Sequence, residues 1–339
     1  MAAARLKDVA ERAGVSVKTV SNVVRGEVRV AEATRSRVLS AIDELGYRPN
    51  TSARRLRTGR SGVIALAVPE LTGYFSEFVA CVFAEATSHG LTVMIEQTGG
   101  DPRAELRIAT GSGDQVVDGV ILSPLRLSPA DLAAHERRLP LVLLGERDYD
   151  VPADHVLIDN VAAARAATLH LAAAGRRRLA ALGAQQGQFA TTSQRLHGFQ
   201  LALHEAGLVF DPRLAPPLPD LLRRHGLDAM RGLLASGPPP DGVFCFNDEV
   251  AHGALRALHE AGLRCPADVA VVGFDDIDES RYAVPSLTSV APDKPALARA
   301  AVSALLARIG EPEARPHAVL HAPWDLRIRE STVGGTVSP

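Results

Sequence analysis

Cysteine is scarce in this 339-residue sequence, and long hydrophobic runs are absent. The three cysteines, Cys81, Cys245 and Cys265, form no CxxC pair and no zinc-ligand spacing, which argues against a disulfide framework or a structural zinc site. No stretch approaches the roughly 18 apolar residues of a membrane-spanning helix, so we expect no membrane contact. The opening stretch, MAAARLKDVAERAG, carries charges where a signal peptide would be apolar, and we therefore expect a cytoplasmic protein.

Familiar catalytic signatures are missing as well. The sequence contains no HExxH, GxSxG, Walker A or GxGxxG motif, and its 11 histidines share no metal-ligand spacing. We therefore expect no enzyme activity, no cofactor and no bound metal. The composition, 46% hydrophobic and 22% charged, is that of a soluble globular protein, and the length suggests two or three domains.

Charge is distributed unevenly along the chain. Residues 1–60 contain 13 Lys and Arg against 6 Asp and Glu, a net charge of +7, whereas the remainder contains 24 against 33, a net charge of −9. A small basic segment on a larger acidic body is typical of a nucleic-acid-binding module attached to a second function. The alternative, a basic arm without a partner, requires that the segment have no organised structure.

The segment LKDVAERAGVSVKTVSNVV (residues 6–24) predicts two short helices joined by a tight turn. Gly14 suits the left-handed conformation that ends a helix, and Ser16 suits the N-cap of the next one. The inward face of the first helix is Leu6, Val9, Ala10 and Ala13, and that of the second is Val20, Val23 and Val24. This arrangement predicts a helix-turn-helix.

A third helix is expected over about residues 34–45, ended by Gly46. Its apolar stripe would be Val38, Ala41, Ile42 and Leu45.

In a helix-turn-helix, the second helix enters the major groove of DNA with its first residues at base edges. On the outward side of that helix, Lys18 can donate to guanine, Asn22 can pair with adenine, and Val17 can contact a thymine methyl group. Thr19 suits a phosphate contact. The expected DNA contacts of this helix are Val17, Lys18, Thr19, Ser21 and Asn22.

Residues 6–60 resemble the DNA-binding head of the LacI/GalR family of bacterial transcription regulators. The motifs that carry the resemblance are DVAERAGVSVKTVSNVV, then ELGYRPN, then the arginine-rich stretch ARRLRTGR. Asn22 stands where the family usually has arginine, a departure that bears on base preference. Ala31 stands where the family has a serine or a similar cap, which should cost a little helix stability.

The resemblance implies a head over residues 1–50 and a hinge over residues 51–61. In the family, the hinge folds on DNA, so Leu56 would wedge into the central base step in the minor groove. The arginines beside it, Arg54, Arg55 and Arg57, would neutralise phosphates. A flexible basic linker is the alternative.

From Gly62 onward, short apolar runs alternate with helical segments, which predicts α/β architecture with parallel sheets. The expected strands are residues 63–69, 91–97, 119–124, 141–145, 155–160, 178–183, 242–247 and 269–276. About 270 residues exceed one comfortable sheet, so we expect two lobes with a cleft between them.

The motifs VDGVILSP, SQRLHGF, NDEVAHGAL, VVGFDD and RYAVPSLTSV resemble the family's core, which is similar to periplasmic sugar-binding proteins. The resemblance implies an effector-binding core over residues 62–330 and a tail over residues 331–339. One lobe would comprise residues 62–160 and 292–324, and the other residues 161–291 and 325–330, including a last strand.

Three side chains are candidates for ligand contact: Asn247 and Asp275 at predicted strand ends, and Arg195 in a loop or helix start after the strand RLAALG. Together they offer donors, an amide and a charged acceptor, a set suited to sugar hydroxyls, and the family uses matching positions in this way. Taken singly, Arg195 could be a surface charge, Asn247 a turn residue and Asp275 a helix cap.

The other lobe offers Tyr74, Phe75, Gln97 and Ser123. The two aromatic residues are equally compatible with the hydrophobic core. Leu221 stands where many sugar-responsive members carry an aromatic residue, and Gly145 where several carry aspartate, so the effector need not be a plain hexose.

The sequence thus predicts a homodimeric transcription regulator, most simply a repressor, that binds a near-palindromic operator in double-stranded DNA. A small, sugar-like effector in the cleft would control it. Only STVGGTVSP follows Glu330, without the leucine repeat of the family's tetrameric members, which favours a dimer. A transport-type sugar-binding protein or a cleft enzyme would be the alternatives if the head did not bind DNA.

Overall fold

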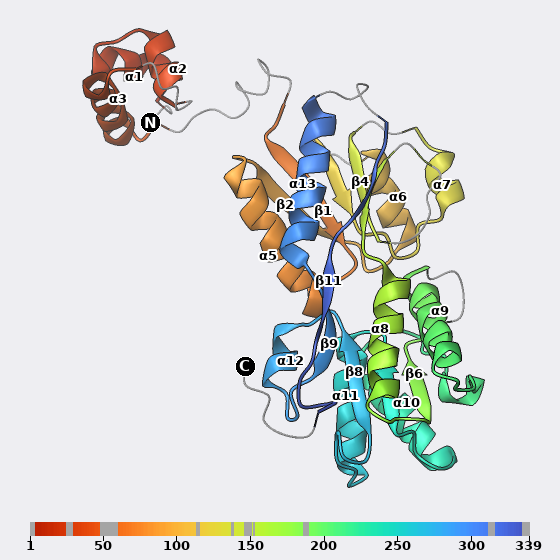
Figure 1. Ribbon diagram of the computed structural model, residues 1–339. Coiled ribbons are helices and arrows are strands. Elements are labelled where there is room, and N and C mark those ends of the chain that lie inside the picture. Colours follow the sequence, from red (N-terminus) through yellow and green to blue (C-terminus); the bar gives the residue numbers. More distant parts are fainter. Residues whose placement is uncertain are drawn as a thin grey trace. The chain divides into compact units, whose positions relative to one another are not determined.

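The computed structural model describes residues 4–24, 30–47, 60–112, 116–136, 139–145, 151, 153–185, 190–310 and 316–333. The chain forms two compact units, Met1–Ser61 and Gly62–Pro339, which we call the head and the core (Figure 1). The hinge residues Arg54, Arg55, Leu56 and Arg57 lie outside the described residues.

The head contains three helices, α1 (Leu6–Ala13), α2 (Val17–Val24) and α3 (Glu32–Leu45). Gly14 takes a left-handed φ of 64° and ends α1, and the Ser16 hydroxyl accepts a hydrogen bond from the Thr19 backbone N–H at 3.1 Å. The helices enclose a small core of Val9, Ala10, Ala13, Val20, Val23, Val38, Ala41 and Tyr47. The predicted helix-turn-helix is confirmed.

Two residues expected in this small core face solvent instead. Val24 is 36% exposed, because adjacent helical residues point about 100° apart and Val23 takes the inward direction. Leu45 is 37% exposed, because the chain turns at Gly46 and Tyr47 fills that end of the core.

The first sheet of the core has the strand order β10-β5-β4-β3-β1-β2, with every neighbouring pair parallel. Its strands are β1 (Val63–Val68), β2 (Thr92–Gln97), β3 (Val120–Leu122), β4 (Leu141–Leu144), β5 (Asp154–Leu157) and β10 (Val319–His321). Helices α5 (Gly73–Ser88) and α13 (Lys294–Gly310) lie side by side on one face, and α6 (Pro102–Thr110) and α7 (Pro129–Ala133) cover the other (Figure 1). Ile64 and Leu66 of β1 face the first layer and Ala65 and Ala67 the second, so the strand reads as a continuous apolar run.

The second sheet has the order β11-β9-β8-β7-β6. Its strands are β6 (Leu179–Leu182), β7 (Gly242–Cys245), β8 (Ala270–Phe274), β9 (Thr288–Pro292) and β11 (Trp324–Arg327), which runs antiparallel to β9. Helices α8 (Asn160–Ala173) and α9 (Ala190–Glu205) pack on one face. The other face is covered by α10 (Arg223–Ser236) and α11 (Asp248–Glu260), while η1 (Pro212–Leu214) and α12 (Asp278–Tyr282) are short connections.

The chain passes between the two sheets three times: between β5 and α8, between β9 and α13, and between β10 and β11. A helical head and a two-sheet core with mostly parallel strands confirm the predicted fold class. All eight expected strands are present, whereas β9 and β10 were not among them. Within the described ranges, no helix has the length and apolar character needed to cross a bilayer.

Candidate functional site

A cavity of about 450 Å³ lies where strands of both sheets end. The first sheet supplies the segments that follow β1 to β5, and the second supplies those that follow β6, β7 and β8. In parallel α/β sheets, ligands bind at the carboxyl ends of strands, so this is where a small molecule is expected.

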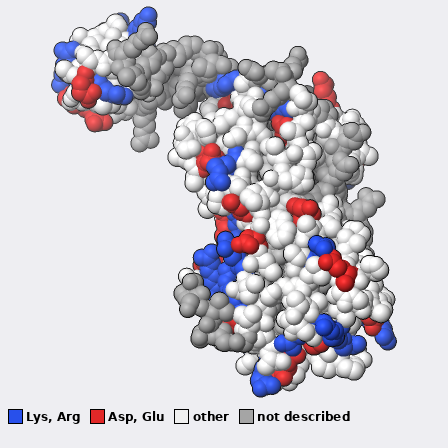
Figure 2. Space-filling view, viewed as in Figure 1, with Lys and Arg blue, Asp and Glu red and all other residues white. Residues whose placement is uncertain are grey.

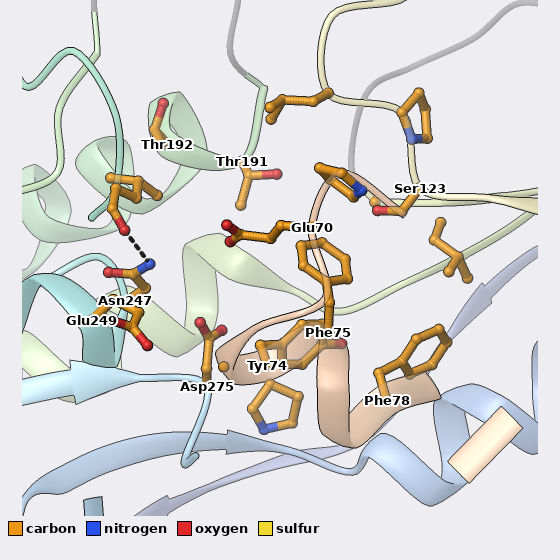
Figure 3. Close-up of a pocket in the computed structure, with 18 of the residues that line it drawn as sticks. Glu70, Tyr74, Phe75, Phe78, Ser123, Thr191, Thr192, Asn247, Glu249 and Asp275 are labelled. Carbon is orange, nitrogen blue, oxygen red and sulfur yellow. Dashed lines mark hydrogen bonds between the residues drawn. The ribbon is translucent and has the colours of Figure 1, made fainter. Parts of the chain in front are cut away.

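All seven side chains proposed from the sequence line this cavity. Tyr74, Phe75, Ser123, Asn247 and Asp275 are labelled in Figure 3. They are Tyr74, Phe75, Gln97 and Ser123 from the first sheet, and Arg195, Asn247 and Asp275 from the second. Tyr74 and Phe75 also pack against the hydrophobic core, with ring centroids 5.4 Å apart, so they serve both purposes that the sequence left open.

Arg195 is a buried cation in the second turn of α9, so the interpretation of Arg195 as a surface charge is wrong. Its Nε donates to Oδ1 of Asn160 at 2.7 Å, and Nη1 donates to the carbonyl of Phe246. The guanidinium lies 3.5 Å above the centroid of the Phe274 ring, a favourable cation–π position. Its Nη2 lies 3.9 Å from Oδ1 of Asp275, so one buried cation accompanies the carboxylate at the end of β8.

Asn247 is the N-cap of α11. Its Oδ1 accepts from the Val250 N–H at 2.8 Å, and its Nδ2 donates to the carbonyl of Leu221 at 3.0 Å, the bond dashed in Figure 3. The amide thereby fixes the Leu221 loop to the start of α11, with a second N–H remaining on the same nitrogen.

Asp275 follows β8 with its carboxylate directed into the cavity (Figure 3). Its backbone φ is 105°, and that of Asp276 is 46°. The helix-cap interpretation of Asp275 is wrong, because the N-cap of α12 is Ile277.

Asp248 is fully buried behind the cavity wall. It accepts hydrogen bonds from the hydroxyls of Ser289 at 2.6 Å and Ser280 at 2.7 Å, and from the Ile277 N–H at 3.0 Å. Burial, reinforced by the nearby Asp275 carboxylate, raises the pKa of Asp248 to about 7. Asp275, which lines the cavity, and Asp248, which lies behind it, are therefore two interacting acids.

Sequence reasoning missed further polar lining residues, among them Glu70, Asp220 and Glu249. Glu70 directly follows Pro69 after β1, a strand-end position that could have indicated it. Burial raises the pKa of Glu70, and the nearby carboxylates of Glu249 and Asp220 raise it further. A hydrogen bond with the Thr72 side chain lowers this pKa, but the effect of burial is larger. Glu249 itself pairs with Arg223, whose Nη2 lies 3.0 Å from Oε1.

The cavity is thus rich in hydrogen-bond acceptors beside the aromatic rings of Tyr74, Phe75 and Phe78, a combination that suits a polyhydroxylated molecule with one apolar face. The described ranges hold no group of three or more His, Cys, Asp or Glu side chains arranged to bind a metal ion.

The head presents a second candidate surface on α2. Val17 is 44% exposed and Lys18 is exposed, whereas Ser21 and Asn22 are half-buried. The Thr19 hydroxyl lies 2.9 Å from that of Ser16, so Thr19 contributes to the helix start as well.

In Figure 2, basic and acidic side chains of the core form small mixed groups on a largely uncharged face.

Comparison with known proteins finds family matches in both the head and the core. Residues 5–50 match the bacterial regulatory proteins of the lacI family, and residues 168–332 match the periplasmic binding protein-like domain. The transcriptional repressor CytR of Escherichia coli K12 is 33% identical over 307 residues, which cover 90% of this chain and 89% of CytR. The chain belongs to the lacI family of bacterial regulatory proteins.

Solved structures of this family extend over nearly the whole chain. A lac repressor dimer bound to operator and an anti-inducer is 29% identical, has a TM-score of 0.82 and covers 98% of this chain and 100% of its own. A complex of the regulator CelR with cellobiose is 33% identical and has a TM-score of 0.72. The match covers 97% of this chain and 99% of the CelR chain. The resemblance inferred from the motifs is confirmed, and these lacI-family relatives are transcription regulators, not enzymes.

Proposed function

We propose that this lacI-family regulator is a repressor that binds operator DNA as a homodimer and responds to a small, sugar-like effector in the core cavity. The observation that carries the proposal is the convergence of the seven side chains proposed from the sequence on one cavity, in a chain that also has a helix-turn-helix. The operator-bound lac repressor dimer and the CelR–cellobiose complex support the two halves of the proposal. Binding to operator DNA on the bacterial chromosome would require the protein to be in the cytoplasm.

A dimer would present two copies of α2 to two half-sites, so the operator should be a near-palindrome. Asn22→Ala should relax base preference at one position per half-site and cost about 1–3 kcal/mol for each base pair read. A systematic set of single-base operator variants, titrated with both proteins by fluorescence anisotropy, measures this. An equal loss on every sequence would show that Asn22 contacts only the DNA backbone.

The effector half of the proposal is tested at Asp275. Asp275→Ala should remove the acceptor that faces the cavity and weaken effector binding by about 1.5–3 kcal/mol. Operator affinity without effector should stay close to that of the parent protein. The measurement is thermal shift and calorimetry with a panel of mono- and disaccharides that includes cellobiose, followed by operator titrations with any ligand found.

Asp325→Ala is the matched control, because Asp325 is an exposed carboxylate on β11 that does not line the cavity. An unchanged effector midpoint in Asp275→Ala would remove Asp275 from the binding site. Absence of any sugar response in the parent protein would count against the sugar-like effector itself.

A further inference from the structure

The turn that carries Asp275 is strained. Asp275 and Asp276 are consecutive non-glycine residues with positive φ, 105° and 46°. Such conformations are unfavourable for non-glycine residues and persist only when surrounding contacts enforce them. The contacts that enforce this turn therefore decide where the Asp275 carboxylate points.

Strand β9 supplies two of these contacts. The Asp275 N–H donates to the carbonyl of Val290 at 2.8 Å, and the Asp276 N–H donates to the hydroxyl of Ser289 at 3.1 Å. Both bonds lie within the second sheet, so they fix the turn relative to that half of the core only.

Two cations hold the other side of the turn. Nη2 of Arg329 lies 2.6 Å from Oδ1 of Asp276, and Nζ of Lys294 donates to the backbone carbonyl of Asp276 at 2.9 Å. Lys294 is only 7% exposed and begins α13, the helix that packs on the first sheet. A buried ammonium needs partners for its charge and its donors, and the Asp276 carbonyl is one of them.

The second partner of Lys294 is Glu77 on α5, whose Oε2 lies 2.9 Å from Nζ. The other oxygen of Glu77 accepts from the backbone N–H of Asp278, the first residue of α12, at 2.7 Å. Lys294 also lies 5.6 Å from the ring centroid of Tyr74, which lines the cavity. One buried lysine and one glutamate thus connect the cavity walls of both halves.

We propose that Lys294 and Glu77 form a junction that couples occupancy of the cavity to the relative position of the two halves of the core. The inference rests on the proposed effector site. A ligand that contacts Asp275 acts on a turn whose carbonyl is held by Lys294, and any shift of that turn changes the Lys294–Glu77–Asp278 contacts between α13, α5 and α12. Lys294 and Glu77 are therefore positioning residues that transmit, rather than make, the ligand contact.

The test compares operator affinity with and without saturating ligand, using cellobiose or the first panel sugar that binds the parent protein. The measured quantity is the ratio of the two affinities, which for coupled sites is typically about 5- to 150-fold. Lys294→Met and Glu77→Gln should each bring this ratio close to one even when ligand is saturating. The double variant should lose no more coupling than either single variant, since both act through one junction.

Lys294→Arg is the conservative variant, because a guanidinium can still donate to both the Asp276 carbonyl and Glu77, and it should restore much of the ratio. Arg299→Met is the matched control on the same helix, since Arg299 is exposed, and it should leave the ratio unchanged. If Lys294→Met does not fold, Glu77→Gln carries the test alone.

If Lys294→Met or Glu77→Gln keeps the parent protein's ratio of operator affinities with and without saturating ligand, the proposed junction is overturned, whatever happens to ligand affinity. A parent protein that binds no panel sugar overturns the proposed sugar effector instead, and calorimetry on the parent separates these two failures. Loss of the ratio in Arg299→Met as well would show a general disturbance of α13 and would also overturn the specific role of Lys294.

Discussion

Arg308→Met should lower the free energy of unfolding of the core by about 3–5 kcal/mol at neutral pH, the typical cost of removing one partner from a buried ion pair. Arg308 is 4% exposed and its partner Asp154 is 2% exposed. Nε and Nη2 of Arg308 contact the two carboxylate oxygens of Asp154 at 2.8 and 3.0 Å. Urea unfolding followed by the fluorescence of Trp324 measures the loss.

The pair joins parts of the first sheet that are distant in sequence. Arg308 lies near the end of α13, Asp154 begins β5, and the same carboxylate accepts from the Ala318 N–H at 2.8 Å just before β10. Arg308 also donates to the carbonyl of Pro316 at 2.8 Å. Removing the guanidinium leaves a buried carboxylate without its buried cation, although the Ala318 N–H still donates to it, which explains the large expected effect.

The pH dependence provides an internal check. Burial would raise the pKa of Asp154, but hydrogen bonds from Arg308 and Ala318 outweigh it and hold the pKa below its usual value. The stabilisation is therefore present above the unfolded-state pKa of about 4 and is lost as the pH falls through the lower folded-state pKa. The deficit of Arg308→Met should shrink in acid, because a protonated Asp154 no longer needs a cation.

Two further variants separate the buried pair from generic charge effects. Arg165→Met breaks the exposed pair with Glu205 and should cost only about 0–1 kcal/mol. Replacing both Asp154 and Arg308 with apolar residues of similar volume should recover most of the stability. A deficit as small as that of Arg165→Met would show that Arg308 is not effectively buried.

The sequence predicted most strands because parallel strands covered on both faces read as continuous apolar runs. Strand β9 does not fit that pattern. Thr288 and Ser289 are fully buried but polar, and their hydroxyls bond to the Arg329 carbonyl and to Asp248. β10 has three residues at a sheet edge, too few for a pattern. Side-chain hydrogen bonds that compensate for buried polarity are visible only once the fold brings their partners together.

The candidate site, like the strands, could be predicted from the sequence only in part. Asn247 and Asp275 could be predicted because strand ends in a parallel sheet meet at one edge. The burial of Arg195 against Phe274 could not, because it depends on how α9 packs against β8. The junction at Lys294 was equally invisible, since Glu77 lies more than 200 residues away on α5 and the contact with Asp276 depends on a strained turn.

A second substitution with a large expected effect, this time on DNA binding, is at Leu56 in the predicted hinge, which lies outside the described residues. Leu56 is a single apolar side chain among Arg54, Arg55 and Arg57. A hinge helix over residues 51–58 would be too short to be stable in isolation, so the family resemblance implies that it forms on DNA. A leucine inserted between base pairs unstacks a step and bends the duplex, which gains additional protein contacts.

Leu56→Ala should therefore abolish operator bending and move specific affinity toward nonspecific affinity, which for such proteins is about 10³–10⁷-fold weaker. Nonspecific binding and its salt dependence should persist, because the phosphate-neutralising arginines remain. Circular permutation gels measure the bend, and titrations at several salt concentrations measure the slope. Arg57→Gln is the matched control: it should reduce the salt slope by about one phosphate contact and retain the bend. A Leu56→Ala protein that bends its operator as the parent does would leave Leu56 as part of a flexible basic linker.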